Sequence, residues 1–347
     1  MGIVELSERK QQILKTIIAE YIRTAEPVGS KALSELPELS FSSATIRNEM
    51  SELEEMGYLE KPHTSAGRVP SHKGYRFYVD HLMRRPVAPI SAKDETALMA
   101  LKSKELDRLI QEAGRLISSL TNYAAVAVTP HLSHMTIRQF ELISVDERTY
   151  VVVIVTDANV VKNKLVHTAA PVTKAEAELL AYVLNQILTA IPITQITAER
   201  FDVVQRAAGL TALLAPVAEF ISELIEDMGN QKVFLEGANK LLRFPEYHDT
   251  SKAQTLLAYM NDDKKHLIPI QQEIDGVQIF IGSENGQNPL SDTSMIYAKY
   301  GIGDIGQGMI GIVGPTRMDY AALSARLSGF AKGLNKLIAE TFYDENK

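Results

Sequence analysis

The chain has 347 residues, which at roughly 150 residues per domain predicts two or three domains. Hydrophobic residues make up 45% and charged residues 23% of the sequence, as in an ordinary globular protein, and no apolar run is long enough to predict a membrane span. The absence of cysteine excludes disulfides, thiolate nucleophiles and cysteine-bound zinc. Together with a charged N-terminus that lacks an apolar signal core, it predicts a cytoplasmic protein.

The formal net charge of −7 is unevenly distributed along the chain. Residues 1–85 carry equal numbers of basic and acidic side chains, so the whole excess of acid lies after residue 85. Within residues 61–85 the bases outnumber the single acid, Asp80, and three histidines add further donors. A compact basic patch is the electrostatic footprint of phosphate contact, although charge alone is equally consistent with a solvated surface.

The first 85 residues predict a small unit of helices followed by a strand and a basic loop. The predicted elements are a helix over 7–24 capped by Ser7, a short helix over 30–36 capped by Ser30, a third helix over 44–56 opened by Ser42-Ser43 and closed by Gly57, a strand at 58–61, a loop over 62–70 and a helical stretch over 75–83. This order is typical of a winged helix-turn-helix, in which the later helix enters the major groove of DNA.

The third helix has one apolar side and one side that is small and polar at its start and acidic at its end. Ala44 on the polar side permits close approach, and Arg47 and Asn48 are the residue types that read guanine and adenine. The acidic end would repel phosphate, so we expect it to point away from DNA. The alternative is an ordinary surface helix.

The segment from Lys61 to Arg68 predicts a wing, because Pro62 and Gly67 favour a tight hairpin. Its polar side chains would contact phosphate or enter the minor groove, and the alternative is a plain basic hairpin. The candidate DNA-binding residues are Ser43, Ala44, Thr45, Arg47, Asn48, Ser51, Lys61, His63, Thr64, Ser65, Arg68, Lys73 and Arg76.

The rest of the chain predicts one domain inserted into another. A stiff linker at 85–89 marks the first boundary. The predicted elements after it are a long amphipathic helix over 91–120, a strand at 124–128, a β-meander over 137–168, helices over 173–228 broken at Ile191-Pro192 and Gly209, a strand at 233–235, a helix over 251–259, strands at 277–282, 294–301 and 309–314, and a final helix over 319–342. The meander and its helices lie between elements of an α/β type, which indicates the insertion.

Two short motifs resemble ligand sites but predict none. Gly301, Gly303 and Gly306 have the spacing of the dinucleotide fingerprint, yet a strand follows where the fingerprint requires a helix, so a glycine-rich hairpin is expected. His131 and His134 lack a nearby cysteine or carboxylate motif that would complete a metal site. We therefore expect no catalytic residues, no cofactor and no metal.

The run from Tyr150 to Val155 has high β-propensity and contains neither charge nor proline. These are the properties of an aggregation-prone strand, and a buried central strand has the same composition. Both interpretations hold together, because heating would expose a strand that is buried in the folded protein.

Two runs of sequence resemble the HrcA family, the heat-inducible transcription repressors of bacteria. They are ATIRNEMSELEEMGYLEKPHTSAGRVPSHKGYRFYVD at 44–80 and GMIGIVGPTRMDY at 308–320. The resemblance implies an α+β multidomain fold: a winged helix-turn-helix over 1–85, a GAF-like α/β domain over 92–130 and 231–347, and an inserted dimerisation domain of β-meander plus helices over 131–230.

The resemblance further implies a homodimer that binds an inverted-repeat operator in double-stranded DNA ahead of chaperone operons, with a GroEL-type chaperonin as the partner that keeps it active. Two rival functions are a regulator that responds to a metabolite in the GAF-like domain and an enzyme with an appended DNA-binding domain. The enzyme would need a constellation of nucleophile or metal ligands that the sequence does not present.

Overall fold

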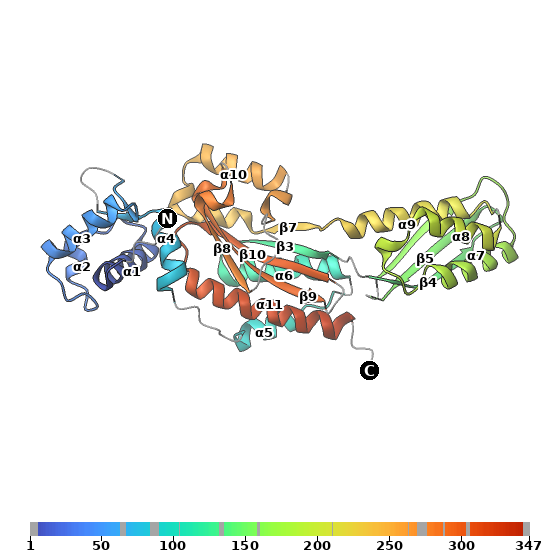
Figure 1. The fold of residues 1–347 in the computed structure, drawn as a ribbon, viewed down its shortest axis with the longest axis horizontal. Coiled ribbons are helices and arrows are strands. Elements are labelled where there is room, and N and C mark those ends of the chain that lie inside the picture. Colours follow the sequence, from blue (N-terminus) through green and yellow to red (C-terminus); the bar gives the residue numbers. More distant parts are fainter. Residues whose placement is uncertain are drawn as a thin grey trace.

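The computed structural model describes residues 6–62, 67–83, 90–103, 105–131, 135–157, 160–209, 211–262, 264–268, 276–286, 289–302 and 306–342. Its elements fall into three groups that follow one another along the long axis of the molecule (Figure 1). We call them the N-terminal group (residues 6–83), the central body (residues 90–131 and 231–342) and the distal group (residues 135–230). Each group contains its own antiparallel sheet, which confirms a mixed α and β fold.

The N-terminal group contains the predicted helices and a two-stranded sheet. Its elements are α1 (Glu8–Thr24), α2 (Ser30–Ser34), α3 (Ser43–Glu55), β1 (Leu59–Glu60), β2 (Val69–Pro70) and α4 (His72–Phe77), which continues as a π-helical turn over Tyr78–Leu82. The Ser7 side chain caps α1 as predicted, by accepting from the amide of Lys10.

The prediction that Ser30 caps α2 is wrong. Gly29 is the N-cap residue, and Ser30 is the first residue of the helix. The Ser30 hydroxyl lies 3.2 Å from the hydroxyl of Ser43, so it connects α2 to the start of α3. Ser30 already has helical backbone, so the extended N-cap position falls to Gly29, which has no side chain to cap the helix.

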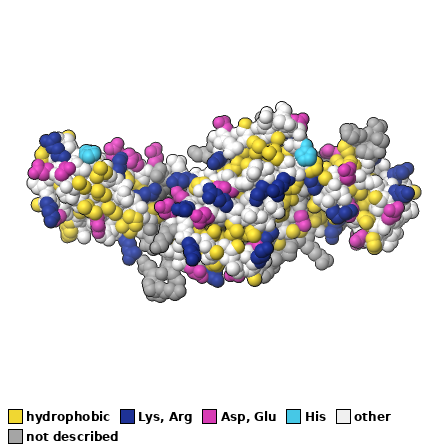
Figure 2. Space-filling view, turned by 180° about the vertical axis from the view of Figure 1, so that it is seen from behind, with side chains coloured by type: hydrophobic (Ala, Val, Ile, Leu, Met, Phe, Trp, Pro, Cys, Tyr) yellow, Lys and Arg dark blue, Asp and Glu magenta, His cyan; other side chains and the backbone are white. Residues whose placement is uncertain are grey.

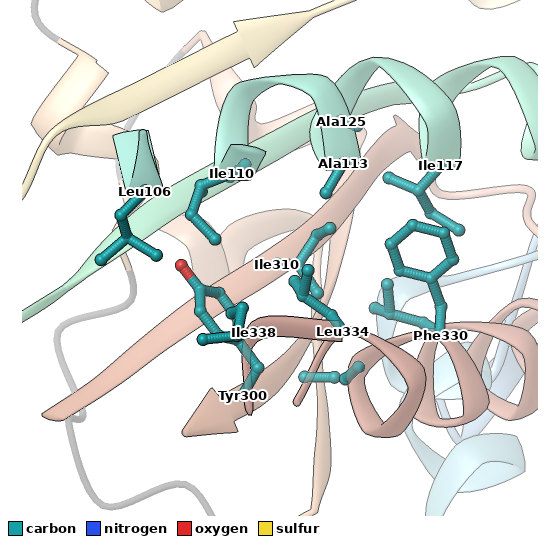
Figure 3. Close-up of a cluster of buried hydrophobic side chains, with 14 of the residues drawn as sticks. Leu106, Ile110, Ala113, Ile117, Ala125, Tyr300, Ile310, Phe330, Leu334 and Ile338 are labelled. Atoms are coloured by element: carbon teal, nitrogen blue, oxygen red, sulfur yellow. The ribbon is translucent and has the colours of Figure 1, made fainter. Parts of the chain in front are cut away.

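The central body is a five-stranded antiparallel sheet with helices on both faces. The strands lie in the order β7 (Val233–Glu236), β3 (Ala124–His131), β10 (Gly306–Pro315), β9 (Thr293–Ile302) and β8 (Val277–Ile281). One face packs against α6 (Leu106–Thr121) and α11 (Tyr320–Phe342), whose side chains interdigitate with those of the sheet (Figure 3). The other face packs against α10 (Thr250–Asp262) and neighbouring 3-10 turns.

The single long helix predicted from 91 to 120 is wrong, because the chain forms two helices. α5 (Ala92–Met99) and α6 are separated by residues 100–105. α6 carries the predicted apolar stripe into the core below β3. α5 packs instead against α11, where the buried Asp94 forms an ion pair with Arg326. Two different packing partners override a continuous helical pattern.

The chain leaves the central body at the end of one strand and returns from the distal group at the start of the neighbouring strand. β3 enters it and β7 returns from it, and the two strands pair with each other, Val128 opposite Val233. The amide of Lys232 donates to the Thr129 hydroxyl at 2.8 Å, so the two ends of the inserted segment lie side by side. This is the connectivity expected when one unit is inserted into another.

The distal group is a three-stranded sheet with helices on one face. β5 (Thr149–Thr156) lies between β4 (Ile137–Ser144) and β6 (Val161–His167), and the helices are α7 (Lys174–Ile187), α8 (Ala198–Ala208) and α9 (Leu214–Gly229). The helices break near Pro192 and Gly209 as predicted. Tyr150, Val152 and Ile154 of β5 are buried, while the residues between them are half-buried on the opposite face. β5 is therefore a central strand, as predicted.

The glycine-rich motif joins two strands that pair antiparallel, β9 and β10, as expected of a hairpin. Gly301 in β9 pairs with Gln307 in β10, so a strand follows the motif. Residues 303–305 and 132–134, which include parts of both ligand-like motifs, lie outside the described residues. No helix in the described part of the chain is long and apolar enough to span a membrane.

Candidate nucleic-acid interface

α3 presents its first two turns to the surface, as the sequence predicts. The Ser42 side chain accepts from the amide of Thr45 at 3.2 Å, which fixes the start of the helix. The helix buries Ile46, Met50 and Leu53 against α1 and α2. Consequently the opposite side is exposed at its N-terminal end.

Three candidate residues share that exposed end of α3. Ala44, Arg47 and Asn48 are all exposed, and the only large side chains among them are an arginine and an amide. Thr45 and Ser51 flank them and are half-buried, and Ser43 lies against Ser30 of α2. Arginine and asparagine are the side-chain types that can bond in pairs to base edges in a major groove, and here they stand on a surface that is otherwise small.

Two bases outside α3 form ion pairs with Glu49, Glu52 and Glu54 of that helix. Lys10 of α1 lies 2.8 Å from Glu49 and 2.7 Å from Glu52, and these hydrogen bonds raise the pKa of the Lys10 ammonium. Arg68 forms an ion pair with Glu54. These partners were not predicted from the sequence, since both bases lie outside α3 and its helical periodicity does not reveal them.

The base of the predicted wing is a small sheet closed by a third stretch of backbone. β1 pairs with β2, and Val28 exchanges two backbone hydrogen bonds of 2.9 Å with Arg68. Gly67 passes so close to Val28 that a Cβ atom there would lie 2.4 Å from the Val28 carbonyl oxygen. Glycine is required at this position for steric reasons, and the hairpin is held firmly against the turn that follows α1.

The structure separates the predicted basic residues into different roles. Lys61 is exposed beside β1. The Lys73 ammonium donates to the carbonyl of Met56 at 2.7 Å and lies over the ring of Tyr58, so its charge is engaged at the C-terminal end of α3. Arg76 faces the central body instead, where it contacts Glu284. His63, Thr64 and Ser65 of the predicted wing lie outside the described residues.

The N-terminal group therefore brings together Ser43, Ala44, Thr45, Arg47, Asn48 and Ser51 on one end of α3. Lys61 is exposed beside β1, whereas Arg68, Lys73 and Arg76 make internal contacts. Within the part of the chain that the structure describes, no group of three or more histidine, aspartate or glutamate side chains is placed to hold a metal ion.

The comparisons with known proteins agree on one family. Residues 107–323 match the family model described as the HrcA protein C-terminal domain. The chain is 36% identical over 346 residues to the heat-inducible transcription repressor HrcA of Ruminiclostridium cellulolyticum, covering 96% of this chain and 97% of that protein. It is 37% identical over 328 residues to the repressor of the same name from Acetivibrio thermocellus, covering 93% of each chain.

One solved structure resembles the whole fold. It is described as a hypothetical protein at 2.2 Å resolution, and it aligns with a TM-score of 0.61 and 24% identity, covering 97% of this chain and 100% of that one. This likeness supports the arrangement of the elements, and says nothing of function.

Proposed function

Because this chain belongs to the HrcA family of heat-inducible transcription repressors, we propose that it represses transcription by binding an inverted-repeat operator ahead of chaperone operons as a dimer. The family is one of transcription repressors and not of enzymes. A GroEL-type chaperonin would keep the repressor active in the cytoplasm. The observation that carries the DNA-binding proposal is the exposed end of α3, with Arg47 and Asn48 beside Ala44.

We assign one part of this proposed function to each of the predicted domains. Residues 1–85 are the winged-helix DNA-binding domain, residues 92–130 and 231–347 are the GAF-like body, and residues 131–230 are the inserted dimerisation domain. The pairing of β3 with β7 supports the insertion, because a unit that enters and leaves through neighbouring strands does not interrupt the sheet it is inserted into. The closure of the wing by Val28 supports the winged-helix assignment.

The surface proposed for dimerisation is the face of the distal sheet opposite its helices. Four of its apolar side chains are at least half exposed: Ile143 (50%), Val145 (61%), Val161 (58%) and Leu165 (53%). Ile143, Val151 and Leu165 lie opposite one another on the three strands and form a continuous apolar row. Figure 2 shows hydrophobic side chains gathered at this end of the molecule.

A second copy of the chain is the occupant that fits this sheet face. Soluble proteins rarely expose a contiguous apolar patch unless it contacts a partner. A twofold dimer brings the same patch of each protomer together, so the apolar row of Ile143, Val151 and Leu165 can pack against its own copy. A dimer with twofold symmetry also matches an inverted repeat, because each protomer reads one half-site.

The proposed dependence on a chaperonin has a physical basis in the same group. β5 is a strand of six consecutive apolar residues from Tyr150 to Val155, and local opening would expose it. The central body is discontinuous, and β3 must pair with β10 from the far end of the chain. Such non-local pairing folds slowly, and slowly folding multidomain chains expose apolar surface.

The test follows operator binding and light scattering together during a temperature ramp, with and without chaperonin and ATP. We expect binding to disappear as scattering rises, and chaperonin with ATP to delay or reverse both changes. If heating abolished binding reversibly, without scattering and without any effect of chaperonin, the protein would itself be the thermosensor and the chaperonin proposal would be wrong. If the protein bound no inverted repeat at low temperature, the operator proposal would fail.

A further inference from the structure

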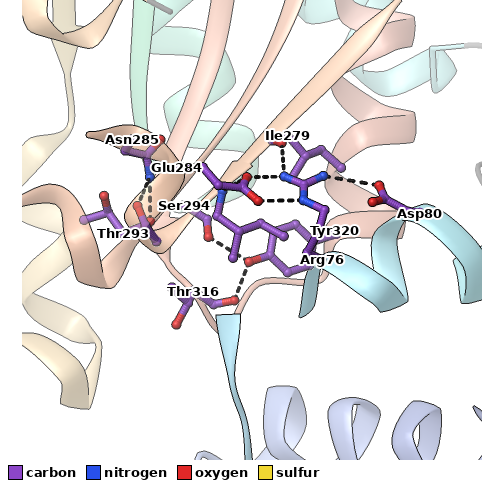
Figure 4. A network of polar contacts seen from close by, with 11 residues as sticks. Arg76, Asp80, Ile279, Glu284, Asn285, Thr293, Ser294, Thr316 and Tyr320 are labelled. Atoms are coloured by element: carbon purple, nitrogen blue, oxygen red, sulfur yellow. Dashed lines mark hydrogen bonds and ion pairs between the residues drawn. The ribbon is translucent and has the colours of Figure 1, made fainter. Parts of the chain in front are cut away.

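The N-terminal group is joined to the central body by two arginines that each contact several acceptors. Arg76 of α4 donates through Nε to Glu284 Oε1 at 2.7 Å and through Nη2 to the carbonyl oxygen of Ile279 in β8 at 2.6 Å (Figure 4). Its Nη1 atom lies 3.3 Å from Asp80 of the π-helical turn. Glu284 is itself fixed, because it accepts from the amide of Ile281. A planar guanidinium with three acceptors has little freedom to rotate.

The second arginine reaches in the opposite direction, from the body to α1. Arg317 donates through Nε to Glu246 at 2.7 Å and through Nη1 to the carbonyl oxygen of Ile22 at 2.9 Å. That carbonyl belongs to the last turn of α1, where helix carbonyls lack intrahelical partners and favour a cation. Both charged side chains are largely buried, with exposed fractions of 11% and 21%, so solvent screens this pair less than a surface pair.

Between the two arginines, residues of the N-terminal group pack closely against residues of the central body. The rings of Tyr75 in α4 and Tyr320 in α11 are both buried and meet edge to face, with centroids 5.8 Å apart. His72 lies directly over Gly282, where a Cβ atom would be 2.4 Å from the imidazole ring. We call this contact region, comprising Arg76, Glu284, Arg317 and Glu246 with the two tyrosines, the joint. It combines close packing with directional ion pairs on either side.

We infer that the joint fixes the angle between α3 and the central body. Arg76 and Arg317 thereby determine which spacing between the two operator half-sites the proposed dimer accepts. The inference rests on the proposed function. When two reading units are tethered, the second binds with a high effective concentration only if the tether places it over its half-site. A rigid joint confines that advantage to one spacing, since half-site separation is a geometric property of the protein.

A joint that only holds the molecule together would affect stability without affecting spacing. Arg76 and Arg317 are therefore positioning residues, because they act on DNA through the orientation of α3. Loosening them should leave the affinity for one half-site unchanged. It should weaken binding at the preferred spacing and relax discrimination against other spacings.

The experiment compares the wild type with the double variant Glu246→Gln/Glu284→Gln, which keeps both side chains nearly the same size and removes both negative charges. The matched control is Glu20→Gln, which removes the partner of Arg23 within α1 and does not touch the joint. The probes are the inverted repeat that the wild type selects from a random duplex library, versions with the spacer changed by about half a helical turn, and a single half-site.

We expect the wild type and Glu20→Gln to bind the altered spacers at least about tenfold more weakly than the selected site. The double variant should show a penalty of less than about threefold, with half-site binding equal to that of the wild type. A double variant that discriminates between spacings as strongly as the wild type would overturn the inference and leave the proposed function intact. A wild type that selects no inverted repeat would overturn the proposed function, and the inference with it.

A distance measurement across the joint distinguishes a change of angle from a loss of folding in the variant. The chain has no cysteine, so Lys15→Cys in α1 and Lys332→Cys in α11 give one spin label on each side of the joint without background thiols. The distribution of label distances should broaden in the double variant and stay narrow in Glu20→Gln, with melting temperatures that show all three proteins folded. An equally narrow distribution in the double variant would show that these ion pairs do not fix the angle, and would overturn the inference.

Discussion

The Nε atom of Arg68 lies 2.7 Å from Oε2 of Glu54, and this ion pair joins the wing to the last turn of α3. Arg68 was predicted to contact phosphate, and its guanidinium already has an internal anion. Glu54 was predicted to repel phosphate, and its charge is offset by the same contact. The ion pair therefore engages the positive charge that was expected to bind phosphate, and it offsets the negative charge that was expected to repel phosphate.

Lys61 and Arg68 should differ in how they affect the salt dependence of DNA binding. Lys61 is exposed, so Lys61→Ala should lower the slope of log K against log salt by about one unit on any DNA sequence. Arg68→Ala should lower this slope by clearly less than Lys61→Ala does. It should also reduce the free energy of unfolding by up to about 1 kcal/mol. Filter binding over a salt series and urea unfolding measure the two effects. Equal slope changes in both variants would show that Arg68 contacts phosphate despite Glu54.

Arg47 and Asn48 should carry base readout. Arg47→Ala should weaken binding to the operator by about 1–3 kcal/mol and should change binding to random DNA little, because a bidentate contact to a base is lost. Asn48→Ala should behave in the same way at a different base pair. Competition assays with operators mutated one base pair at a time provide the measurement.

The control for both variants is Glu55→Ala, at the exposed but distant end of the same helix. It should leave the preference for operator over random DNA unchanged. If Arg47→Ala weakened both DNAs equally, Arg47 would be a phosphate contact and the assignment of base readout to this residue would be incorrect.

A charge on the open face of the distal sheet should dissociate the dimer. Leu165→Lys places an ammonium in the apolar row of Ile143, Val151 and Leu165, so burying that row in an interface becomes unfavourable. Sedimentation velocity should show a monomer that melts near the wild-type temperature. Leu179→Lys is the matched control, because Leu179 is a comparably exposed leucine on α7 of the same group. A dimeric Leu165→Lys protein would exclude this face as the interface.

The ion pair between Asp94 and Arg326 should make stability depend on pH in the acid range. Hydrogen bonds from Arg326 hold the pKa of the Asp94 carboxyl below its usual value of 3.8. The pair thus stabilises the folded state above the unfolded pKa, and this contribution is lost as pH falls through the lower, folded pKa. Asp94→Asn should cost about 2 kcal/mol at neutral pH, since Asp94 is buried.

The difference in unfolding free energy between wild type and Asp94→Asn should be constant above about pH 5 and should shrink below about pH 4. Urea titrations across this range measure it. Glu112→Gln, which removes an exposed i,i+4 pair with Arg108, should cost less than about 0.5 kcal/mol at every pH. A difference that persists unchanged at low pH would assign the effect of Asp94→Asn to packing.

Much of the fold could be predicted because it depends on local patterns. The alternation of buried and half-buried residues in β5 is present in its sequence, and the stripe of α6 has helical spacing. The break between α5 and α6 could not be predicted, since no proline or glycine stands there. It arises because α5 packs on α11, which is more than 200 residues away in sequence.

The candidate site was predictable to the same extent. The exposed face of α3 follows from helical periodicity, so Arg47 and Asn48 could be identified from the sequence. The partners of the basic residues could not, because the charge of a residue is visible in the sequence and its neighbour is not. Arg76 contributes to a basic run between residues 61 and 85, yet its acceptors Glu284 and Ile279 lie 208 and 203 positions later.

The pairing of β3 with β7 makes the inserted segment separable from the sheet that carries it. If the segment were absent, a short turn after Thr129 could lead directly to Lys232, and the two strands would form an ordinary hairpin at the edge of an unchanged sheet. The inserted segment can therefore be exchanged or shortened without a change in the order of the strands in the central sheet. If the inserted segment is the proposed dimerisation unit, the number of DNA-binding units in an assembly would be set by a segment that enters and leaves the central sheet near one edge.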